Sequence, residues 1–408
     1  MKILLATFFM VPHLGGIWNY MQQLKIRLES LGHEVDLLGY GEGNHFVHIV
    51  NEQRQIEMNQ LKSFLYPVLD QQTNAIIHKD PLIKHYEFLR YYYELGATYL
   101  GLEKYDLIHT QDVLSTACMN RIRPNHSALV ASLHGSVAHE LKQHVNNVLK
   151  TPTAKQACAY IDKLEFDGAS SGECTIVANN WLKNMLINEF LVSPEQIKVL
   201  HYGYDIEGFA KKLKESPPVK RPVNKKIITY TGRLTEIKGV HHLVGALAQL
   251  KQIRNDWVCW IVGDGDKKEE LQMQSIALGL ENNVFFLGRR DDIPALLESS
   301  DIFVAPSLLE NQPLSVIEAQ IAGKAVIVSD SGGLPEMVNH ESTGIISPSG
   351  DESLLCFNLN RLLEDRQLRE TLGTNAQSWG LSYWSLDNAI QSILNVYQNA
   401  LSKKQLSL

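Results

Sequence analysis

The most chemically informative residues are two glutamates, Glu310 and Glu318, which are separated by seven residues. A helix is expected to begin between them, because Pro313 has no N–H to lose at a first helical position. The N–H groups of Leu314 and Ser315 would then lack helical partners and point outward, with the positive end of the helix dipole behind them. Such a helix start favours an anion such as a diphosphate. Glu310 would lie at the mouth of this site, and Glu318 about one helical turn deeper.

Two cations lie at the end of another expected strand. Arg233 follows the apolar run 227–230, and Lys238 comes a few residues later. Their charge-assisted hydrogen bonds could neutralise a leaving diphosphate, a task that otherwise often falls to a bound metal. Taken alone, a pair of loop cations is more commonly solvated, and so is a pair of glutamates near a helix start. The combination of all four residues favours a binding site.

Small residues and one histidine also follow strand ends. Gly15 and Gly16 lie between the first expected strand and the first helix, where missing side chains let backbone N–H groups approach an anion or a sugar. His134 follows the strand that ends at Leu133, and an imidazole can accept from or donate to a hydroxyl near neutral pH. The positions of these residues are more informative than their types, because most Gly-Gly pairs are turns and most histidines are structural.

Two further turns follow strands in the second half of the chain. Gly263 and Gly265 come after the strand 258–262, and Gly288 with Arg289 comes after the strand 284–287. The first turn is not a dinucleotide fingerprint, because residues 266–268 are Asp-Lys-Lys and the third glycine of G-x-G-x-x-G is missing. A dehydrogenase is therefore disfavoured.

The spacing of Glu310 and Glu318, together with the run Gly332-Gly333-Leu334-Pro335-Glu336, resembles the donor-site signature of the family 4 retaining glycosyltransferases. The resemblance is densest from about residue 227 to 346. It implies that Glu310 contacts hydroxyls of the transferred sugar, that Glu318 contacts the ribose of the nucleotide and that His134 contacts the sugar. The other positions that it places around the donor are strand ends and the helix start: Gly15, Gly16, Gly263, Gly265, Gly288, Arg289, Leu314 and Ser315.

The chain departs from the family pattern in two places. Gln312-Pro313 stands where the family commonly has Phe-Gly, which removes one backbone donor and a packing aromatic ring. The segment 201–205, His-Tyr-Gly-Tyr-Asp, stands where the family commonly has Asn-Gly-Val-Asp. We assign no chemistry to this second segment, which we expect to be a turn beside the linker.

The resemblance implies transfer of a sugar from a nucleotide-diphosphate sugar to a hydroxyl acceptor, which can be a glycan, a lipid-linked or a small-molecule acceptor. Synthesis of a polysaccharide or glycoconjugate is the expected setting. No residue stands out as a covalent nucleophile, so retention fits a same-face substitution in which the leaving phosphate takes the acceptor proton. No metal cofactor is expected.

Two alternatives remain open at this point. A nucleotide-sugar epimerase of the same fold would need its own acid and base. A non-catalytic nucleotide-sugar-binding subunit of a glycan-assembly complex would be expected to lack Glu310, Arg233 or Lys238, and all three are present.

Composition excludes several classes of protein. A net charge of -7 argues against a nucleic-acid partner, and a mean hydropathy of -0.14 excludes a largely membrane-embedded chain. No apolar run reaches the roughly 18 residues needed to span a bilayer. Residues 1–8 indicate a strand rather than a signal peptide, so a cytoplasmic location is expected, with peripheral contact at the inner membrane face left open. The five cysteines are scattered and form no CxxC motif, which argues against disulfides and structural zinc.

Alternating strand and helix patterns predict the α/β class with parallel sheets. The resemblance specifies this as the GT-B fold, in which two Rossmann-like doubly wound lobes face a cleft. The expected order is an N-terminal acceptor-side lobe (1–210) with a helical insertion at about 51–102, a linker rich in proline and charge (211–226), a C-terminal donor-binding lobe (227–382) and a last helix (383–408) that crosses back to the N-terminal lobe.

Overall fold

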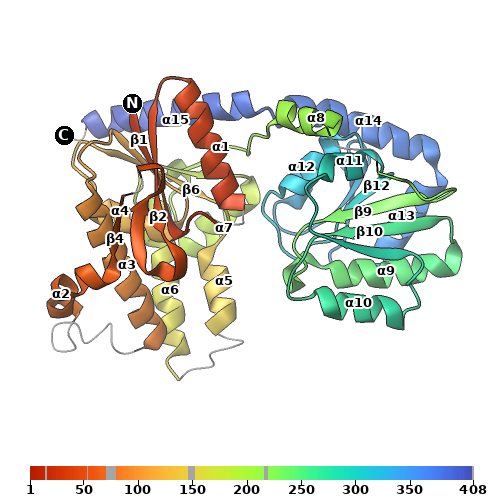
Figure 1. Cartoon of the computed structure of the whole chain (residues 1–408), viewed down its shortest axis with the longest axis horizontal. Coiled ribbons are helices and arrows are strands. Elements are labelled where there is room, and N and C mark those ends of the chain that lie inside the picture. Colours follow the sequence, from red (N-terminus) through yellow and green to blue (C-terminus); the bar gives the residue numbers. More distant parts are fainter. Residues whose placement is uncertain (14–15, 53, 70–79, 146–151, 216–218, 407–408) are drawn as a thin grey trace. The chain divides into compact units, whose positions relative to one another are not determined.

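The structure is a computed structural model that describes residues 1–13, 16–52, 54–69, 80–145, 152–215 and 219–406. The chain forms two compact units, one of Met1–Leu200 with Ile390–Leu408 and the other of His201–Ala389. Each unit is built around one sheet with helices packed against it (Figure 1). The prediction of an α/β protein with two doubly wound, mainly parallel sheets is confirmed.

The sheet of the first unit consists of β1 (Lys2–Met10), β2 (Glu34–Tyr40), β3 (Phe46–Ile49), β4 (Arg54–Glu57), β5 (Leu107–Thr110), β6 (Ala128–Leu133), β7 (Cys174–Val177) and β8 (Ile197–Val199). Their order across the sheet is β4-β3-β2-β1-β5-β6-β7-β8. All neighbours are parallel except β2–β3 and β3–β4, which are antiparallel. Strands β5 and β6 are buried along their whole length, as expected for strands covered on both faces.

All the α-helices described in this unit are α1 (Gly16–Ser30), α2 (Met58–Leu69), α3 (Pro81–Leu100), α4 (Val113–Ile122), α5 (Val137–His144), α6 (Ala154–Ser170), α7 (Asn180–Phe190) and most of α15 (Leu386–Leu406). Helices α3, α4, α5 and α7 of the first unit begin at side-chain caps. Asp80 accepts hydrogen bonds from Leu82 N and Ile83 N, and Asp112 accepts one from Ser115 N, which satisfies N–H groups that lack helical partners.

The second unit has a six-stranded parallel sheet of order β11-β10-β9-β12-β13-β14. Its strands are β9 (Lys226–Thr231), β10 (Trp257–Val262), β11 (Val284–Gly288), β12 (Ile302–Ala305), β13 (Ala325–Ser329) and β14 (Ile345–Ser347). Its helices are α8 (Ile206–Glu215), α9 (Val240–Ile253), α10 (Lys268–Ala277), α11 (Ile293–Glu298), α12 (Leu314–Ile321), α13 (Glu352–Glu364) and α14 (Arg366–Tyr383).

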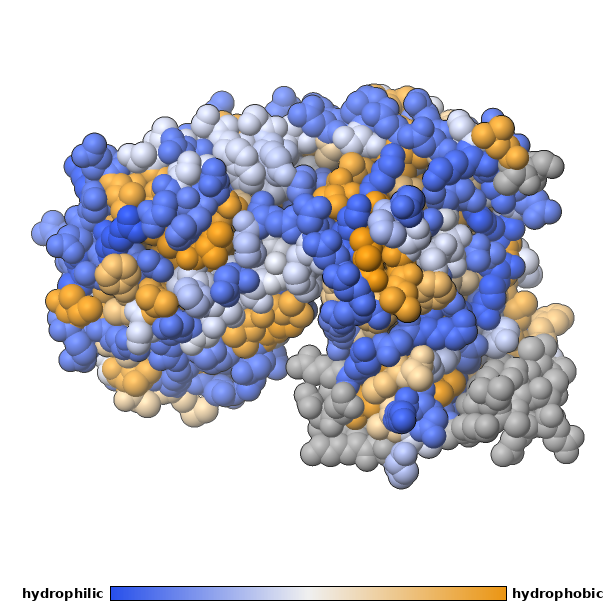
Figure 2. Space-filling view, turned by 180° about the vertical axis from the view of Figure 1, so that it is seen from behind, coloured by the Kyte–Doolittle hydropathy of each residue, from blue (hydrophilic) through white to orange (hydrophobic). Residues whose placement is uncertain are grey.

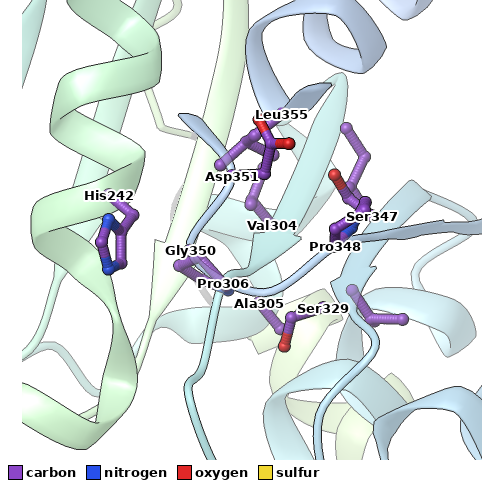
Figure 3. A pocket seen from close by; sticks show the side chains of 12 residues that line it. His242, Val304, Ala305, Pro306, Ser329, Ser347, Pro348, Gly350, Asp351 and Leu355 are labelled. Carbon is purple, nitrogen blue, oxygen red and sulfur yellow. The ribbon is translucent and has the colours of Figure 1, made fainter. Parts of the chain in front are cut away.

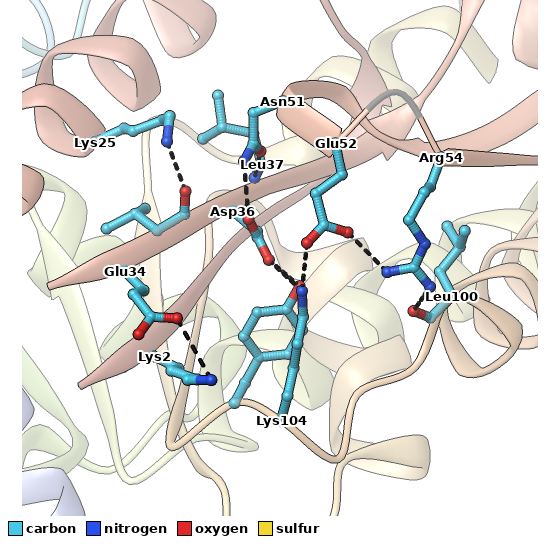
Figure 4. Close-up of polar contacts among 12 residues, drawn as sticks. Lys2, Lys25, Glu34, Asp36, Leu37, Asn51, Glu52, Arg54, Leu100 and Lys104 are labelled. Atoms are coloured by element: carbon cyan, nitrogen blue, oxygen red, sulfur yellow. Dashed lines mark hydrogen bonds and ion pairs between the residues drawn. The ribbon is translucent and has the colours of Figure 1, made fainter.

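A polar cluster fixes the antiparallel edge of the first sheet (Figure 4). Lys104 Nζ lies 2.7 Å from Asp36 Oδ2 and 2.6 Å from Glu52 Oε1, and Tyr105 OH donates to Asp36 at 2.6 Å. Burial would raise the pKa of Asp36, but hydrogen bonds from Lys104, Tyr105 and Asn51 more than offset it and hold this pKa below its usual range. The cluster therefore joins β2 to the turn before β4 and to the loop between α3 and β5.

The structure differs from the expected domain plan in two places. Strand β4 lies inside the range 51–102, which we expected to be helical; β3 and β4 were missed because they are short and alternate buried with polar residues. The units divide at Leu200/His201, and α8 occupies the start of the expected linker 211–226. The boundary falls early because Tyr204 N donates to Trp384 O at 2.8 Å, which attaches this segment to the second unit.

No helix in the described part of the chain is long and apolar enough to cross a membrane. On the face shown in Figure 2, hydrophobic side chains form separate patches among hydrophilic ones in both units. The location of the protein in the cell stays a prediction.

Candidate active site

The second unit brings together loops that leave the carboxyl ends of β9 and β10. Gly232 N donates to Val262 O at 3.0 Å, and Leu234 N donates to Asp264 O at 2.9 Å. Gly263 has a φ of 141°, and a Cβ there would lie 1.8 Å from Gly232 O, so only glycine fits. The predicted turn at Gly263 therefore has a structural cause: two backbones approach each other without an intervening side chain.

Lys238 and Glu310, which the sequence places in different turns, form an ion pair. Lys238 ends a single 3-10 turn after β9 (Glu236–Lys238), and Leu308 N donates to Ile237 O at 2.8 Å to hold the two loops together. Both side chains are 16% exposed, so the pair is screened from water but still reachable. An anion bound beside Lys238 would compete with Glu310 for this ammonium group.

Arg233 lies on the same loop with its side chain exposed. Its backbone carbonyl accepts a hydrogen bond of 2.8 Å from Tyr230 OH. Burial and the nearby negative charge of Glu310 raise the pKa of Tyr230, so this hydroxyl stays protonated and keeps donating. Among the described residues no carboxylate pairs with the Arg233 guanidinium, which leaves it available to an anionic ligand.

We name residues 307–318 the glutamate motif. The turn after β13 holds the loop of this motif through two hydrogen bonds. Gly333 N donates to Glu310 O at 2.9 Å, and Ser331 Oγ donates to Leu308 O. A Cβ at Gly332 would lie 2.0 Å from Glu310 O. The Gly332-Gly333 pair that carried part of the family resemblance therefore sets the backbone position of Glu310.

Helix α12 begins at Leu314, and Pro313 is its N-cap in an extended conformation. This corrects the expectation that Pro313 is the first helical residue. No side chain caps the helix, so the N–H groups of Leu314 and Ser315 are presented at its start, where the helix dipole favours an anion. Glu318 lies in the second turn, and its Oε1 accepts a hydrogen bond of 2.8 Å from Tyr204 OH.

The expected nucleotide-side residues lie at the neighbouring strand ends. Gly263 N donates to Gly288 O at 2.8 Å, which joins the turns after β10 and β11. The Arg289 side chain is 72% exposed, and its Nε lies 3.9 Å from Asp264 Oδ2. Gly265 packs against the backbone of Leu234, where a Cβ would lie 2.3 Å from the carbonyl oxygen.

His134 belongs to the first unit and follows β6. Its Nε2 lies 3.0 Å from Gln111 Oε1, and its ring meets that of Tyr20 edge-on at 5.1 Å. Burial lowers the pKa of His134 to about 4, so the ring is neutral at neutral pH. His134 can therefore exchange hydrogen bonds with a sugar but does not supply a positive charge.

A buried polar network lies behind His134. His109 Nε2 lies 2.7 Å from Ser132 Oγ, and His109 Nδ1 lies 2.7 Å from Tyr397 OH on α15. Burial, and then the nearby His134, lower the pKa of His109 to about 3. Sequence reasoning missed Gln111, His109 and Tyr20; the available signal was that Gln111 and His109 lie at the end of β5, next to the strand that carries His134.

The remaining predicted residues of the first unit are glycines. Gly16 is the first residue of α1 and has open space beside its Cα. Gly15 lies outside the described residues. The predicted positions that the structure describes thus fall into two groups: Gly16 and His134 in the first unit, and the rest in the second.

A small cavity lies at the carboxyl ends of β12, β13 and β14 (Figure 3). Its wall includes Pro306, Ser329, Ser347 and Asp351, with His242 opposite them on α9. None of the predicted site residues lines this cavity. It is therefore not the expected donor site, although it opens at the same edge of the sheet.

Comparisons with known proteins agree with this architecture. The family model for glycosyl transferases group 1 matches residues 211–379, and that for glycosyltransferase family 4 matches residues 14–207. The chain is 26% identical over 354 residues to an Escherichia coli UDP-Gal:alpha-D-GlcNAc-diphosphoundecaprenol alpha-1,3-galactosyltransferase, covering 85% of this chain and 86% of that protein.

Solved structures show the same fold. Sucrose-phosphate synthase from Thermosynechococcus elongatus aligns with a TM-score of 0.76 and 20% identity over 98% of this chain and 99% of the other. Anabaena HepE in complex with UDP-glucose aligns with a TM-score of 0.66 and 21% identity over 98% and 99% of the two chains. The chain therefore belongs to glycosyltransferase family 4, has the GT-B fold and is a glycosyltransferase.

Proposed function

We propose that this glycosyltransferase moves a sugar from a nucleotide-diphosphate sugar to a hydroxyl group, with retention at the anomeric carbon. The observation that carries the proposal is the arrangement in the second unit, where Lys238, Glu310 and the uncapped start of α12 lie on joined loops at one edge of the sheet. HepE, which has this fold, binds UDP-glucose, so UDP sugars are the first donors to test.

The diphosphate is the natural ligand for the cations and the helix start. Arg233 and Lys238 supply positive charge, and the N–H groups of Leu314 and Ser315 supply donors that need no reorganisation as charge develops on the leaving group. Glu310 is proposed to orient the sugar hydroxyls, and neutral His134 is proposed to share in that task. Gly263, Gly265, Gly288 and Arg289 are proposed to border the nucleotide.

Retention follows from a substitution on one face of the sugar. The acceptor oxygen forms a bond to the anomeric carbon while the bond from that carbon to the diphosphate oxygen breaks. The acceptor proton passes to the departing phosphate oxygen, so no protein nucleophile is needed. Because Arg233, Lys238 and the helix start already offset the phosphate charge, we propose that transfer needs no metal cofactor.

The acceptor is proposed to be a growing polysaccharide or glycoconjugate. The Escherichia coli relative is named for a lipid-linked acceptor, an N-acetylglucosamine on diphosphoundecaprenol. This chain could use a glycan, a lipid-linked or a small-molecule acceptor of that general kind, and a binding site at the membrane surface would suit the second.

Slow hydrolysis of the donor tests the stereochemistry without knowledge of the acceptor. UDP-glucose, in which the sugar is α-linked, is incubated with the protein in water, and the released sugar is followed by proton NMR before it mutarotates. The proposal predicts that the α-anomer appears first, at the same rate with Mg²⁺ or EDTA. First appearance of the β-anomer would contradict retention, and an isomerised but intact nucleotide sugar would indicate an epimerase.

A further inference from the structure

The segment 201–205, to which we assign no chemistry from its sequence, contacts the glutamate motif at three points. Tyr202 N donates to Gln312 Oε1 at 3.2 Å, and Asn311 Nδ2 donates to Tyr202 OH at 3.4 Å. Tyr204 OH donates to Glu318 Oε1 at 2.8 Å. The chain departs from the common family pattern in the segment 201–205 and at Gln312. The residues at these two departures thus contact each other.

The backbone of this segment is firmly held. Tyr204 N donates to Trp384 O at 2.8 Å, and Tyr204 pairs with Ser385 in an isolated β-bridge. Trp384 is fully buried, and its Nε1 donates to Gln320 Oε1 at 2.7 Å. Because Gln320 belongs to α12, the same helix that carries Glu318 also anchors the support of Tyr204.

Tyr204 is suited to be a permanent donor. Burial, and then the adjacent Glu318, raise the pKa of its hydroxyl well above the usual range, so the proton stays on the oxygen at every physiological pH. Its ring packs edge-on against Phe209 at 6.1 Å, which limits its rotation.

One carboxyl oxygen of Glu318, Oε1, accepts the hydrogen bond from Tyr204, and the other, Oε2, can accept one from a ligand. Burial favours its neutral form and raises its pKa, while the hydrogen bond from Tyr204 acts in the opposite direction and stabilises the carboxylate. Among the described residues no donor contacts Oε2 of Glu318. A carboxylate accepts several hydrogen bonds, so Oε2 can receive hydroxyl groups of a ligand.

We propose that Tyr204 is a positioning residue for nucleotide recognition, which fixes the Glu318 carboxylate so that Oε2 faces the ribose hydroxyls of the donor. This inference rests on the proposed function, together with the family resemblance that assigns Glu318 to the ribose of the nucleotide. A glutamate without this partner would spread over several rotamers, and binding would have to order it at an entropic cost. Tyr204 therefore contributes to affinity without touching the nucleotide.

The test is the preference for ribose hydroxyls. Binding of UDP and 2′,3′-dideoxy-UDP, with GDP and 2′,3′-dideoxy-GDP in parallel, is measured by calorimetry for the wild-type protein, Tyr204→Phe, Glu318→Ala and the double variant. Tyr204→Phe keeps the packed ring and removes only the hydroxyl. Tyr383→Phe is the matched control, because its hydroxyl bonds to His201 in the same region and not to the glutamate motif.

Tyr204→Phe is expected to weaken binding of the ribonucleotide by about tenfold, the effect of one hydrogen bond to a charged group, and to leave the dideoxynucleotide unchanged. In the Glu318→Ala background the same change should have no further effect, since Tyr204 acts through Glu318. Tyr383→Phe should keep the wild-type preference.

Two results would overturn the inference while leaving the proposed function intact: an unchanged ribose preference in Tyr204→Phe, or an equal loss of affinity for both nucleotides of a pair. Additive losses in the double variant would also overturn it. If the folded wild-type protein binds none of these nucleotides, the proposed function itself fails, so the two failures are distinguishable.

Discussion

The pairing of Lys238 with Glu310 shows how single residues of the site control one another. The two side chains are 72 positions apart in the chain, and each is the other's charge partner. The sequence indicated separate roles, diphosphate binding for Lys238 and sugar binding for Glu310. The structure shows that the two side chains already form an ion pair, so under the proposed function the donor would bind both members of this pair.

This pairing predicts a coupled effect on stability. Lys238→Met or Glu310→Gln alone leaves a poorly exposed charge without a partner, and each should lower the free energy of unfolding by about 1–3 kcal/mol. The double variant should lose less than the sum of the two single losses. Chemical denaturation of the four proteins measures this difference, and strictly additive losses would show that the ion pair does not form in solution.

Sugar transfer is expected to depend on the Glu310 side chain more strongly than folding does. Glu310→Ala is expected to abolish sugar transfer while a cooperative unfolding transition remains, because the loop backbone is held by Gly333 N and not by the Glu310 side chain. Near-normal donor turnover in this folded variant would remove Glu310 from the role that we propose for it.

At the scale of elements, helix starts position the candidate residues in both units. Helix α12 presents its uncapped start beside the glutamate motif, whereas α5, which follows His134, is capped by Ser136 through a hydrogen bond of 3.2 Å to His139 N. Behind α5, the fully buried Glu165 on α6 accepts a 2.9 Å hydrogen bond from Ala138 N. The buried carboxyl group thus supports the turn that carries His134.

Glu165 predicts a pH dependence of stability. Burial raises its pKa to about 7 from an ordinary 4.5, against the opposing effects of Ala138 N–H and Ser136. Between these values the folded protein binds more protons than the unfolded chain, so the contribution of Glu165 is full below pH 4.5 and is lost as the pH rises through 7.

Glu165→Gln should remove this dependence, because an amide oxygen still accepts from Ala138 N but does not titrate. The free energy of unfolding of the wild-type protein is expected to fall between pH 5 and pH 8. In Glu165→Gln this fall should be smaller by about 3 kcal/mol. The exposed Glu281→Gln serves as the control and should leave the fall unchanged. An equal pH dependence in Glu165→Gln and the wild-type protein would show that Glu165 does not titrate in this range.

Regular elements with continuous apolar patterns were predictable. Strands β10 and β11 each differ by one residue at one end from the predicted strands 258–262 and 284–287. Strands β3 and β4 were not predictable from periodicity, since each has four residues and pairs antiparallel at an edge, where one face can be polar. The last five residues of α8 lie in the predicted linker 211–226, because they belong to a segment rich in proline and charge; their lysines lie on an exposed face of the helix.

At the scale of the whole molecule, parallel topology explains why much of the site was predictable. The carboxyl ends of neighbouring parallel strands lie along one edge, so Arg233, Gly263 and Gly288 had to come near one another once their strands were recognised. Partners set by side-chain direction were not predictable: Tyr204 and Glu318 are 114 residues apart, and no periodicity indicates that a hydroxyl from one reaches the other.

The central claim is that the second unit binds a nucleotide-diphosphate sugar through the glutamate motif, and ligand-induced thermal stabilisation tests it most directly. The wild-type protein and Glu310→Ala are screened against UDP, GDP, dTDP and ADP with their common sugars. A ligand at about 100 times its Kd adds roughly 2.7 kcal/mol of stability. The account predicts a shift for one nucleotide class in the wild-type protein, with a smaller added effect of the sugar in Glu310→Ala; a folded wild-type protein that no nucleotide stabilises would contradict it.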